Sequence, residues 1–363
     1  EAYTVTHHIA AMGSGFFVDP NGYLVTSGHV VFCFSQQDYA EDPHTKDYII
    51  LDASATLVEE YQEEYGTTQE DVQIIYEYNL QRAEIRHMSR STHVILGEAE
   101  GDVIEDKTGF SAEVVNADPY LGRDLAILKV ELSNTPSLPI GNSDDLEIGD
   151  EVYALGYPGV VTFKPQLSSA TALTPYVTQG IVSAKRLTQQ GTFAIQHSAS
   201  TNHGYCGGPL LDGDGYIVGV NDVDGISELG LEAANFNYAV ASNVLRDFLG
   251  ENNVTNTVCN ATVQYRKGLA YYFAKMYDSA KEQFDAAAAL FPHNSRAGQL
   301  SQECQSAISR GERAESSVAF SAVPSTVEAR SEAITVNGAL QHASEMPMAF
   351  ELSWPATQVT VQY

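Results

Sequence analysis

The sequence lacks any long apolar run, and this absence excludes one class of protein. Of its 363 residues 44% are hydrophobic, yet no stretch approaches the roughly 18–20 consecutive apolar residues of a membrane-spanning helix. The chain is long enough for two or three domains with buried cores. It begins with Glu1 rather than Met, which indicates a processed or recombinant chain. We therefore expect a globular protein that does not span a membrane.

Basic residues are also scarce. There are 19 Lys and Arg against 47 Asp and Glu, which gives a net charge of -28. A field of this sign repels phosphate backbones, so nucleic acid is excluded as an expected partner. A solvated acidic surface accounts for the imbalance more simply than an acidic recognition patch.

Four cysteines are too few for a disulfide scaffold. Cys259 and Cys304 flank a helical segment, and their spacing permits a disulfide without establishing one. Asn253 and Asn260 each begin an Asn-x-Thr triplet. This is the pattern for N-glycosylation, which applies only in a eukaryotic secretory pathway.

One of the four cysteines lies in a turn suited to a nucleophile. Residues 203–210 are His-Gly-Tyr-Cys-Gly-Gly-Pro-Leu, followed by an apolar strand. Glycines let the backbone bend sharply and bring amide N–H groups close to a reacting carbonyl. Cys206 is therefore the candidate nucleophile.

A candidate general base lies near the start of the chain. Residues 12–34 hold two β-prone runs joined by the turn Asp-Pro-Asn-Gly, and His29 directly follows the second run. Together with the Cys206 turn, this stretch resembles the HtrA (DegP-like) branch of the trypsin-like proteases, with Ser27 and Gly28 in place of Asn-Ala and cysteine in place of serine. In that family this histidine is the general base.

A third segment supplies a candidate acid. Residues 124–130 are Asp-Leu-Ala-Ile-Leu-Lys-Val, and they resemble the family segment whose aspartate orients the histidine. Asp124 precedes an apolar strand, which suits that role. Asp118 is a nearby competitor, but it precedes a proline turn and is better explained as a turn residue.

The resemblance implies a mainly β fold of two six-stranded, chymotrypsin-like barrels over roughly residues 10–250. We expect the first barrel at 1–134 and the second at 135–250. Residues 36–91 match the family poorly. Within them, helical spacing predicts an insertion at about 52–90 that consists of two helices broken near Gly66. Two interpretations of this insertion stay open. It carries regulatory or oligomer contacts, or it is a surface hairpin without a function.

A small helical domain is expected at 259–310, where HtrA proteases usually have a PDZ domain. Seven residues fall at the spacings of a tetratricopeptide (TPR) repeat: Gly268, Tyr271, Tyr277, Ala280, Phe284, Ala287 and Pro292. A single repeat serves either peptide binding or plain packing. The tail at 311–363 alternates like strands near 333–336, 349–353 and 358–362.

The implied chemistry is endopeptidase cleavage through a Cys-His-Asp triad and a thioester, with the backbone N–H groups of Gly204 and Cys206 as oxyanion hole. By family position, six residues line the substrate pocket: Ser200, Thr201, Asn202, His203, Val220 and Asn221. No acidic residue lies at the bottom of the pocket, which disfavours a substrate preference for Lys or Arg. The Gly-x-His motif of viral proteases is missing, which disfavours a preference for Gln. A small or medium apolar residue is the expected preference.

The cysteine leaves three interpretations open: a natural cysteine protease, an engineered replacement of serine, and a protease-like protein that no longer cleaves. The last would act as a protein-binding or assembly module. We expect no cofactor and no metal. The expected partners are a polypeptide substrate and a protein, or a second copy, at the TPR-like segment. The resemblance implies an extracytoplasmic location, periplasmic or secreted.

Overall fold

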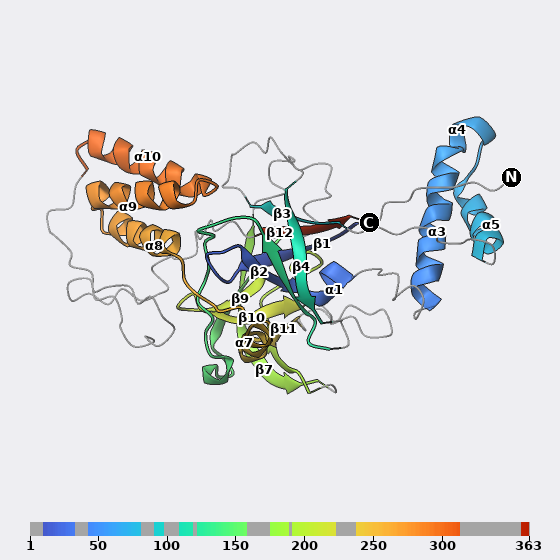
Figure 1. Ribbon diagram of the computed structural model, residues 1–363, viewed down its shortest axis with the longest axis horizontal. Coiled ribbons are helices and arrows are strands. Elements are labelled where there is room, and N and C mark those ends of the chain that lie inside the picture. The colour runs from blue at the N-terminus through green and yellow to red at the C-terminus, as the bar shows by residue number, and fades with distance from the viewer. Residues whose placement is uncertain are drawn as a thin grey trace. The chain divides into compact units, whose positions relative to one another are not determined.

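Strands form the two halves of the region predicted to be a protease, and helices follow them (Figure 1). The computed structural model describes residues 10–32, 43–80, 91–97, 109–118, 122–157, 175–188, 191–222, 237–312 and 357–362. The chain divides into two units. The larger holds residues 12–31 and 92–360, and the smaller holds residues 1–11, 32–91 and 361–363.

The second half of the larger unit is a closed antiparallel barrel. Its strands are β6 (Glu151–Gly156), β7 (Tyr176–Leu187), β8 (Phe193–His197), β9 (Pro209–Asp212), β10 (Ile217–Asp222) and β11 (Asn237–Ala241). They follow the order β10-β11-β8-β7-β6-β9, and β9 pairs with both β6 and β10 to close the ring. Alternate side chains such as Val152 and Ala154 fill the interior, as expected for strands with one face on a core.

The first half is an antiparallel sheet of β1 (Ala10–Phe17), β2 (Tyr23–Ser27), β3 (Ser91–Leu96), β4 (Phe110–Ala117) and β5 (Leu125–Val130). Its strand order is β1-β2-β5-β4-β3, and β12 (Thr357–Gln362) takes the place between β3 and β1. The sequence predicted a mainly β fold of two six-stranded barrels followed by helices. The mainly β architecture, a closed six-stranded barrel and the C-terminal helices are confirmed.

One hydrophobic cluster joins the two halves. Val25 and Ile127 from the first sheet belong to the same buried cluster as Leu211 and Ile217 from the barrel. The helix α7 (Ser242–Glu251) adds Phe248 to it. Fully buried apolar side chains of this size each contribute about 1.5–3 kcal/mol to folding. The two halves therefore form one packed body, and residues at their junction have defined positions.

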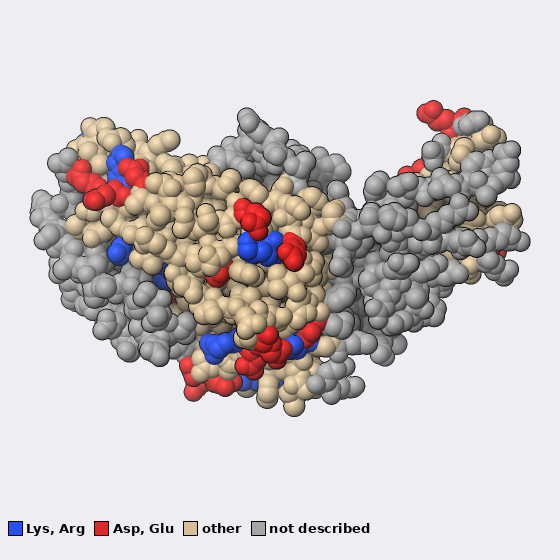
Figure 2. Space-filling model, in the orientation of Figure 1, with Lys and Arg blue, Asp and Glu red and all other residues tan. Residues whose placement is uncertain are grey.

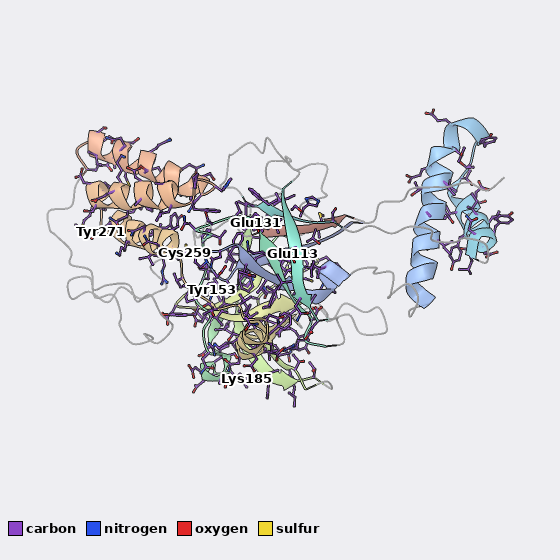
Figure 3. All side chains as sticks on the ribbon, viewed as in Figure 1. Glu113, Glu131, Tyr153, Lys185, Cys259 and Tyr271 are labelled. Atoms are coloured by element: carbon purple, nitrogen blue, oxygen red, sulfur yellow. The ribbon has the colours of Figure 1, made fainter. Side chains whose placement is uncertain are left out.

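Three helices follow the barrel: α8 (Asn260–Phe273), α9 (Tyr277–Leu290) and α10 (Ser295–Ser309). Tyr265 and Phe284 pack with ring centroids 5.6 Å apart between α8 and α9. The hydroxyl of Thr262 on α8 donates to the carbonyl of Ser137 at 3.0 Å, so this segment is tied to the protease body. Figure 3 shows Cys259 at that junction, where α8 begins.

The cysteine pairing that the spacing permitted is not formed. Cys259 and Cys304 are both buried free thiols. The thiol of Cys259 caps α8 instead, because its sulfur accepts the backbone N–H of Thr262 at 3.3 Å. Cys304 faces the buried side of α10, where burial raises the pKa of its thiol to about 11.

Within the smaller unit, the predicted insertion contains α3 (Pro43–Glu60), α4 (Gln62–Tyr65) and α5 (Gln69–Leu80). Helix begins at Pro43, before the predicted start at residue 52, and residues 81–90 lie outside the described part. The helical run turns at Gly66, which has a φ of 66°. The Asp71 carboxylate then accepts the backbone N–H of Thr68 at 2.7 Å, so a left-handed glycine and a capping contact separate the helices.

Most of the predicted tail lies outside the described residues, including the strand-like stretches near 333–336 and 349–353. The third stretch coincides with β12. None of the helices that the structure describes has the length and apolarity needed to cross a bilayer.

Charged side chains are mixed on the surface. On the face shown in Figure 2, Lys and Arg lie beside Asp and Glu over an otherwise uncharged surface. The Nζ of Lys129 lies 3.2 Å from Glu131, and Arg310 pairs with Glu312. This distribution favours the solvated surface over a single acidic patch on the face shown.

The contact between α8 and α9 generates a prediction about Gly268. A Cβ on Gly268 would lie 2.6 Å from the ring of Phe284, whereas Gly298 on α10 has open space around it. We expect Gly268→Ala to destabilise the protein by about 1–3 kcal/mol and Gly298→Ala to be neutral or stabilise it by up to about 1 kcal/mol. Thermal unfolding of both variants measures this, and equal melting temperatures would contradict the close packing.

A second prediction concerns His197, which is fully buried at the end of β8. Burial is the main cause that lowers the pKa of His197 to about 4. An unfolded histidine titrates near pH 6.5. As pH falls from about 6.5 to 4, the unfolded state therefore takes up a proton that the folded state does not, and stability is lost.

We expect urea unfolding of the native chain to lose on the order of 2 kcal/mol between pH 7 and pH 5 through this residue. His197→Leu should remove that part of the pH dependence, and His203→Leu, at an exposed position, should keep it. The assignment would be wrong if both variants retained the native slope.

Candidate active site

His29 is positioned by the step from strand to helix after β2. That strand ends at Ser27, and the short helix α1 (Gly28–Phe32) begins directly. Only glycine fits at position 28, because a Cβ there would lie 1.9 Å from the carbonyl oxygen of Asp118. The sequence difference from the family at Ser27-Gly28 therefore preserves the placement of the histidine.

Asp124 holds His29 at two points. Its Oδ2 lies 2.7 Å from His29 Nδ1, and its Oδ1 accepts the backbone N–H of His29 at 2.7 Å. Asp124 is 3% exposed and has a φ of 51°, in the left-handed region. Such backbone strain in a buried aspartate is typical of functional positions. Asp118, the competitor in the sequence, is instead ion-paired with Arg123.

Cys206 lies in a turn that depends on left-handed glycines. Gly204 has a φ of 103° and Gly207 a φ of 84°. The turn is fixed to β10, since Gly207 donates its N–H to the carbonyl of Asn221 and Asn221 donates its N–H to that of Gly208, each at 2.8 Å. Cys206 is 7% exposed, so its sulfur is held by the body of the fold.

The structure brings the three predicted catalytic side chains together. Burial of the His29 ring lowers its pKa, but hydrogen bonds and charge attraction from Asp124 and from Cys206 outweigh that effect and raise the pKa of His29 to about 11. A histidine with this environment carries its proton at neutral pH. The arrangement favours transfer of the thiol proton to the His29 ring.

The predicted oxyanion hole is compatible with the geometry of the turn. In the described part of the chain, the backbone N–H groups of Gly204 and Cys206 donate to no protein acceptor. The intervening N–H of Tyr205 donates to the carbonyl of Asn202 at 3.0 Å. Donors that folding leaves available in this way can bind a negative oxygen.

Ser14 supports the turn from the first sheet, and sequence reasoning missed it as a functional residue. Its N–H donates to the carbonyl of Cys206 at 2.8 Å, and its Oγ donates to the carbonyl of Gly204 at 2.6 Å. The same Oγ accepts the N–H of Tyr157 at 2.9 Å. The Gly-Ser-Gly motif at 13–15 was the available signal, because it resembled the family at a site away from the triad.

Tyr205 anchors the turn in the barrel core. Its side chain is 2% exposed, and burial raises its pKa to about 12. Gly156 on β6 makes room for it, since a Cβ there would lie 2.8 Å from the tyrosine ring. Hydrophobic packing thus occupies the position where trypsin-like enzymes activated by an ion pair have an acid.

The predicted substrate-binding residues divide into two groups. Asn202 and His203 are exposed beside the turn, Ser200 accepts a hydrogen bond from Thr178 through its carbonyl, and Thr201 bonds to Asn237. The side chains of Val220 and Asn221 are fully buried. Val220 packs in the core, and the Asn221 amide donates to the carbonyls of Leu155 and Pro209. Both side chains are buried, so any part they take in binding substrate stays a prediction.

A second carboxylate lies at the triad. His29, Asp124 and Asp222 each present a nitrogen or oxygen atom within 4.8 Å of one another. Asp222 is half-buried at the end of β10, directly after Asn221. These three side chains are close enough together to bind a divalent cation. His29 and Asp124 are already hydrogen-bonded to each other, so no cation is needed to explain the group. The sequence offered no pattern that would have singled out Asp222.

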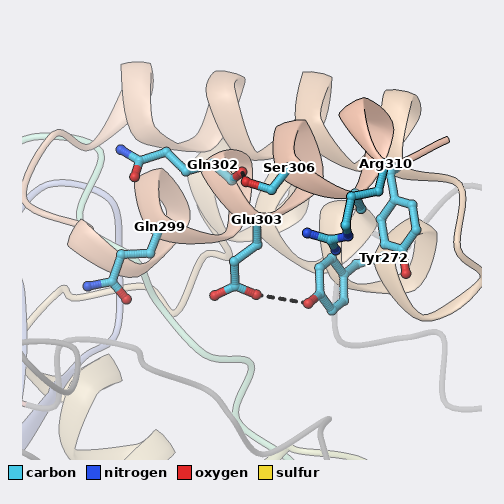
Figure 4. Close-up of a pocket in the computed structure, with 8 residues that line it drawn as sticks. Tyr272, Gln299, Gln302, Glu303, Ser306 and Arg310 are labelled. Atoms are coloured by element: carbon cyan, nitrogen blue, oxygen red, sulfur yellow. Dashed lines mark hydrogen bonds between the residues drawn. The ribbon is translucent and has the colours of Figure 1, made fainter. Parts of the chain in front are cut away.

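The helical segment carries a separate pocket of about 560 Å³. It is lined by residues of α8, α9 and α10 and by Arg310, and the Tyr272 hydroxyl donates to Glu303 at 2.8 Å inside it (Figure 4). None of the triad residues lines it.

This frame, with a closed barrel, a second sheet and a His-Asp-Cys group where they meet, is that of a trypsin-like peptidase domain. A model of the trypsin-like peptidase domain family matches residues 13–220, which is more than half of the chain. The chain belongs to this family.

Curated relatives are similar over part of their length. A "Probable periplasmic serine endoprotease DegP-like" of Chlamydia muridarum is 32% identical over 167 residues, which are 44% of this chain and 31% of the relative. The protein of that description from Chlamydia pneumoniae is 30% identical over 216 residues, 58% of this chain and 28% of the relative. The chain thus spans about 30% of the length of these relatives.

A solved structure titled "HtrA-type protease AlgW with decapeptide" is 22% identical to this chain. The similarity covers 66% of this chain and 51% of that one, with a TM-score of 0.40.

The contacts of Ser14 lead to a prediction about the reactivity of Cys206. Ser14→Ala removes the hydroxyl that joins Gly204 to Tyr157 and leaves two backbone groups without that partner, at a cost of about 1–3 kcal/mol. We expect alkylation of Cys206 by iodoacetamide to slow about tenfold, because the turn is less well held. Ser309→Ala on α10, where the hydroxyl bonds only within its helix, is the control. Native alkylation rates in both variants would refute the supporting role.

Proposed function

We propose that the chain is an endopeptidase of the HtrA-like branch that cleaves peptide bonds through Cys206, His29 and Asp124. The observation that carries the proposal is the two-point contact between buried Asp124 and His29, and the Cys206 thiol is near enough to the same ring to help raise the pKa of His29. A base held in one orientation next to a nucleophile is the arrangement that acyl transfer requires.

In the proposed reaction, His29 accepts the thiol proton and the sulfur of Cys206 attacks the peptide carbonyl carbon. The oxygen becomes negative and is bound by the N–H groups of Gly204 and Cys206, a contact worth about 3 kcal/mol in comparable sites. When the C–N bond breaks, His29 delivers its proton to the leaving amine, and a thioester remains. Water, deprotonated by His29, then adds to the thioester, the C–S bond breaks, and the thiol is regenerated.

The substrate class follows from the surroundings of the turn. Asn202 and His203 are exposed next to Cys206, and the chain has no acid at position 200, where a preference for Lys or Arg would need one. We propose that the protein accepts small or medium apolar residues in unfolded polypeptides. The relatives named periplasmic support an extracytoplasmic location.

A second candidate function is a binding module without catalysis, in which the helical segment is TPR-like and holds a protein partner. The pocket with Tyr272, Glu303 and Arg310 favours it, as does the small-to-large contact of Gly268 with Phe284. Under this alternative, Cys206 is a buried thiol in an inherited frame, either drifted or substituted from serine.

Covalent labelling separates the two functions. We expect a peptide chloromethyl ketone to modify Cys206 in the full chain, and His29→Ala to slow the modification at least a hundredfold by removing the base. His293→Ala, at an exposed turn, is the matched control, and Cys206→Ala corrects for the other thiols. Peptide mapping by mass spectrometry measures the modification.

Cleavage of unfolded casein is the companion assay. The peptidase proposal predicts fragments with the native chain and none with Cys206→Ala. If the native chain neither becomes labelled at Cys206 nor cleaves casein, the binding module is the better account.

A further inference from the structure

Asp222 comes to the triad from a different element than Asp124. It ends β10, whereas Asp124 immediately precedes β5. Side-chain atoms of both carboxylates lie within 4.8 Å of the same His29 nitrogen. The chain has 47 acidic residues, so one more carboxylate is unremarkable at most positions. Two carboxylates beside one imidazole change the chemistry of that imidazole.

The position of Asp222 is defined by the contacts of its neighbour. Asn221 exchanges backbone hydrogen bonds with the Cys206 turn, and its side chain is fixed to Leu155 and Pro209. The hydroxyl of Ser27, two residues before His29, lies 3.4 Å from the Asn221 carbonyl. The strand that anchors the nucleophile therefore also holds Asp222 near the base.

Among the residues that the structure describes, three groups that carry or can carry a negative charge lie at His29. They are Asp124 ahead of β5, Asp222 at the end of β10, and Cys206 once its thiol has lost the proton. Arg123, next to Asp124 in the sequence, is engaged by Asp118 and Glu251. Each anion near a histidine stabilises its protonated form.

A histidine held in its protonated form suits a thiol nucleophile and does not suit a hydroxyl nucleophile. A serine protease needs a neutral imidazole at working pH, because the hydroxyl ionises only as the base takes its proton. A thiol ordinarily ionises near pH 8.5, so it can give its proton to the imidazole in advance and remain as a thiolate beside it. An additional carboxylate thus impairs the first mechanism and supports the second.

We propose that Asp222 is a positioning residue that holds His29 in its charged form and thereby adapts a serine-protease frame to a cysteine nucleophile. This inference rests on the proposed function, because it concerns the same nucleophile and base. The inference also explains the cysteine at position 206, because a charged His29 and a thiol nucleophile suit each other.

The first test measures His29 itself. Imidazole resonances of the full chain, followed by NMR against pH, report when His29 loses its proton, whether or not the protein cleaves peptides. We expect Asp222→Asn to lower that midpoint by about one pH unit, as for loss of a charge about 5 Å away in a partly exposed site. Asp222→Glu should restore most of the shift. Asp214→Asn, at the exposed turn before β10, is the matched control and should leave the midpoint unchanged.

The second test follows alkylation of Cys206 by iodoacetamide across pH 5–10. The native chain should keep a fast plateau through neutral pH, and Asp222→Asn should lower that plateau several-fold because less thiolate is held beside a charged imidazole. An unchanged profile and an unchanged His29 midpoint in Asp222→Asn would overturn the inference while leaving the peptidase proposal intact. Failure of native labelling and casein cleavage would instead remove the peptidase proposal.

A third comparison uses serine as nucleophile. With Asp222 present, Cys206→Ser should be nearly inactive on casein, and Cys206→Ser with Asp222→Asn should recover about tenfold at neutral pH. Equal activity of these two variants would contradict the inference. All measurements are repeated with EDTA, and a His29 midpoint that changes on chelation would overturn it in favour of a cation held by the three side chains.

Discussion

The site depends on the burial of one carboxylate with both of its oxygens engaged by one residue. Asp124 accepts from the ring and from the backbone N–H of His29, so it determines where the base sits and which way its ring faces. Taking an ionised carboxylate out of water is costly unless it is paired and hydrogen-bonded. The strained backbone at Asp124 and the missing Cβ at Gly28 both permit this contact. The local irregularities near the base thus share one physical cause.

The nucleophile turn is held by a second set of contacts that reaches across the two halves. Ser14 from the first sheet bonds to both sides of Tyr205, and Asn221 from the barrel bonds to the two glycines after Cys206. The packing of Tyr205 against Gly156 adds an apolar anchor below the turn. Because these contacts come from separate segments, the backbone N–H groups of the turn are available only when the whole body has assembled. Precise placement of such donors is what makes them effective against a developing charge.

The helices beyond the barrel are an extension of the protease body. Shared hydrophobic packing and the bonds between Ser137 and Thr262 connect them to it. Their pocket and the triad use different residues.

The sequence by itself indicated the mainly β fold, the order of His29, Asp124 and Cys206, the break at Gly66 and the helices after the barrel, because strand alternation, glycine turns and helical spacing are local properties. Only the tertiary structure decided that Val220 and Asn221 face inward, that Cys259 and Cys304 remain apart, and that Ser14 and Asp222 converge on the triad. Those outcomes depend on strand register and on contacts between residues far apart in the chain. A pattern of neighbouring residues cannot encode which carboxylate from β10 meets the imidazole at the start of α1, because the packing of the two halves brings them together.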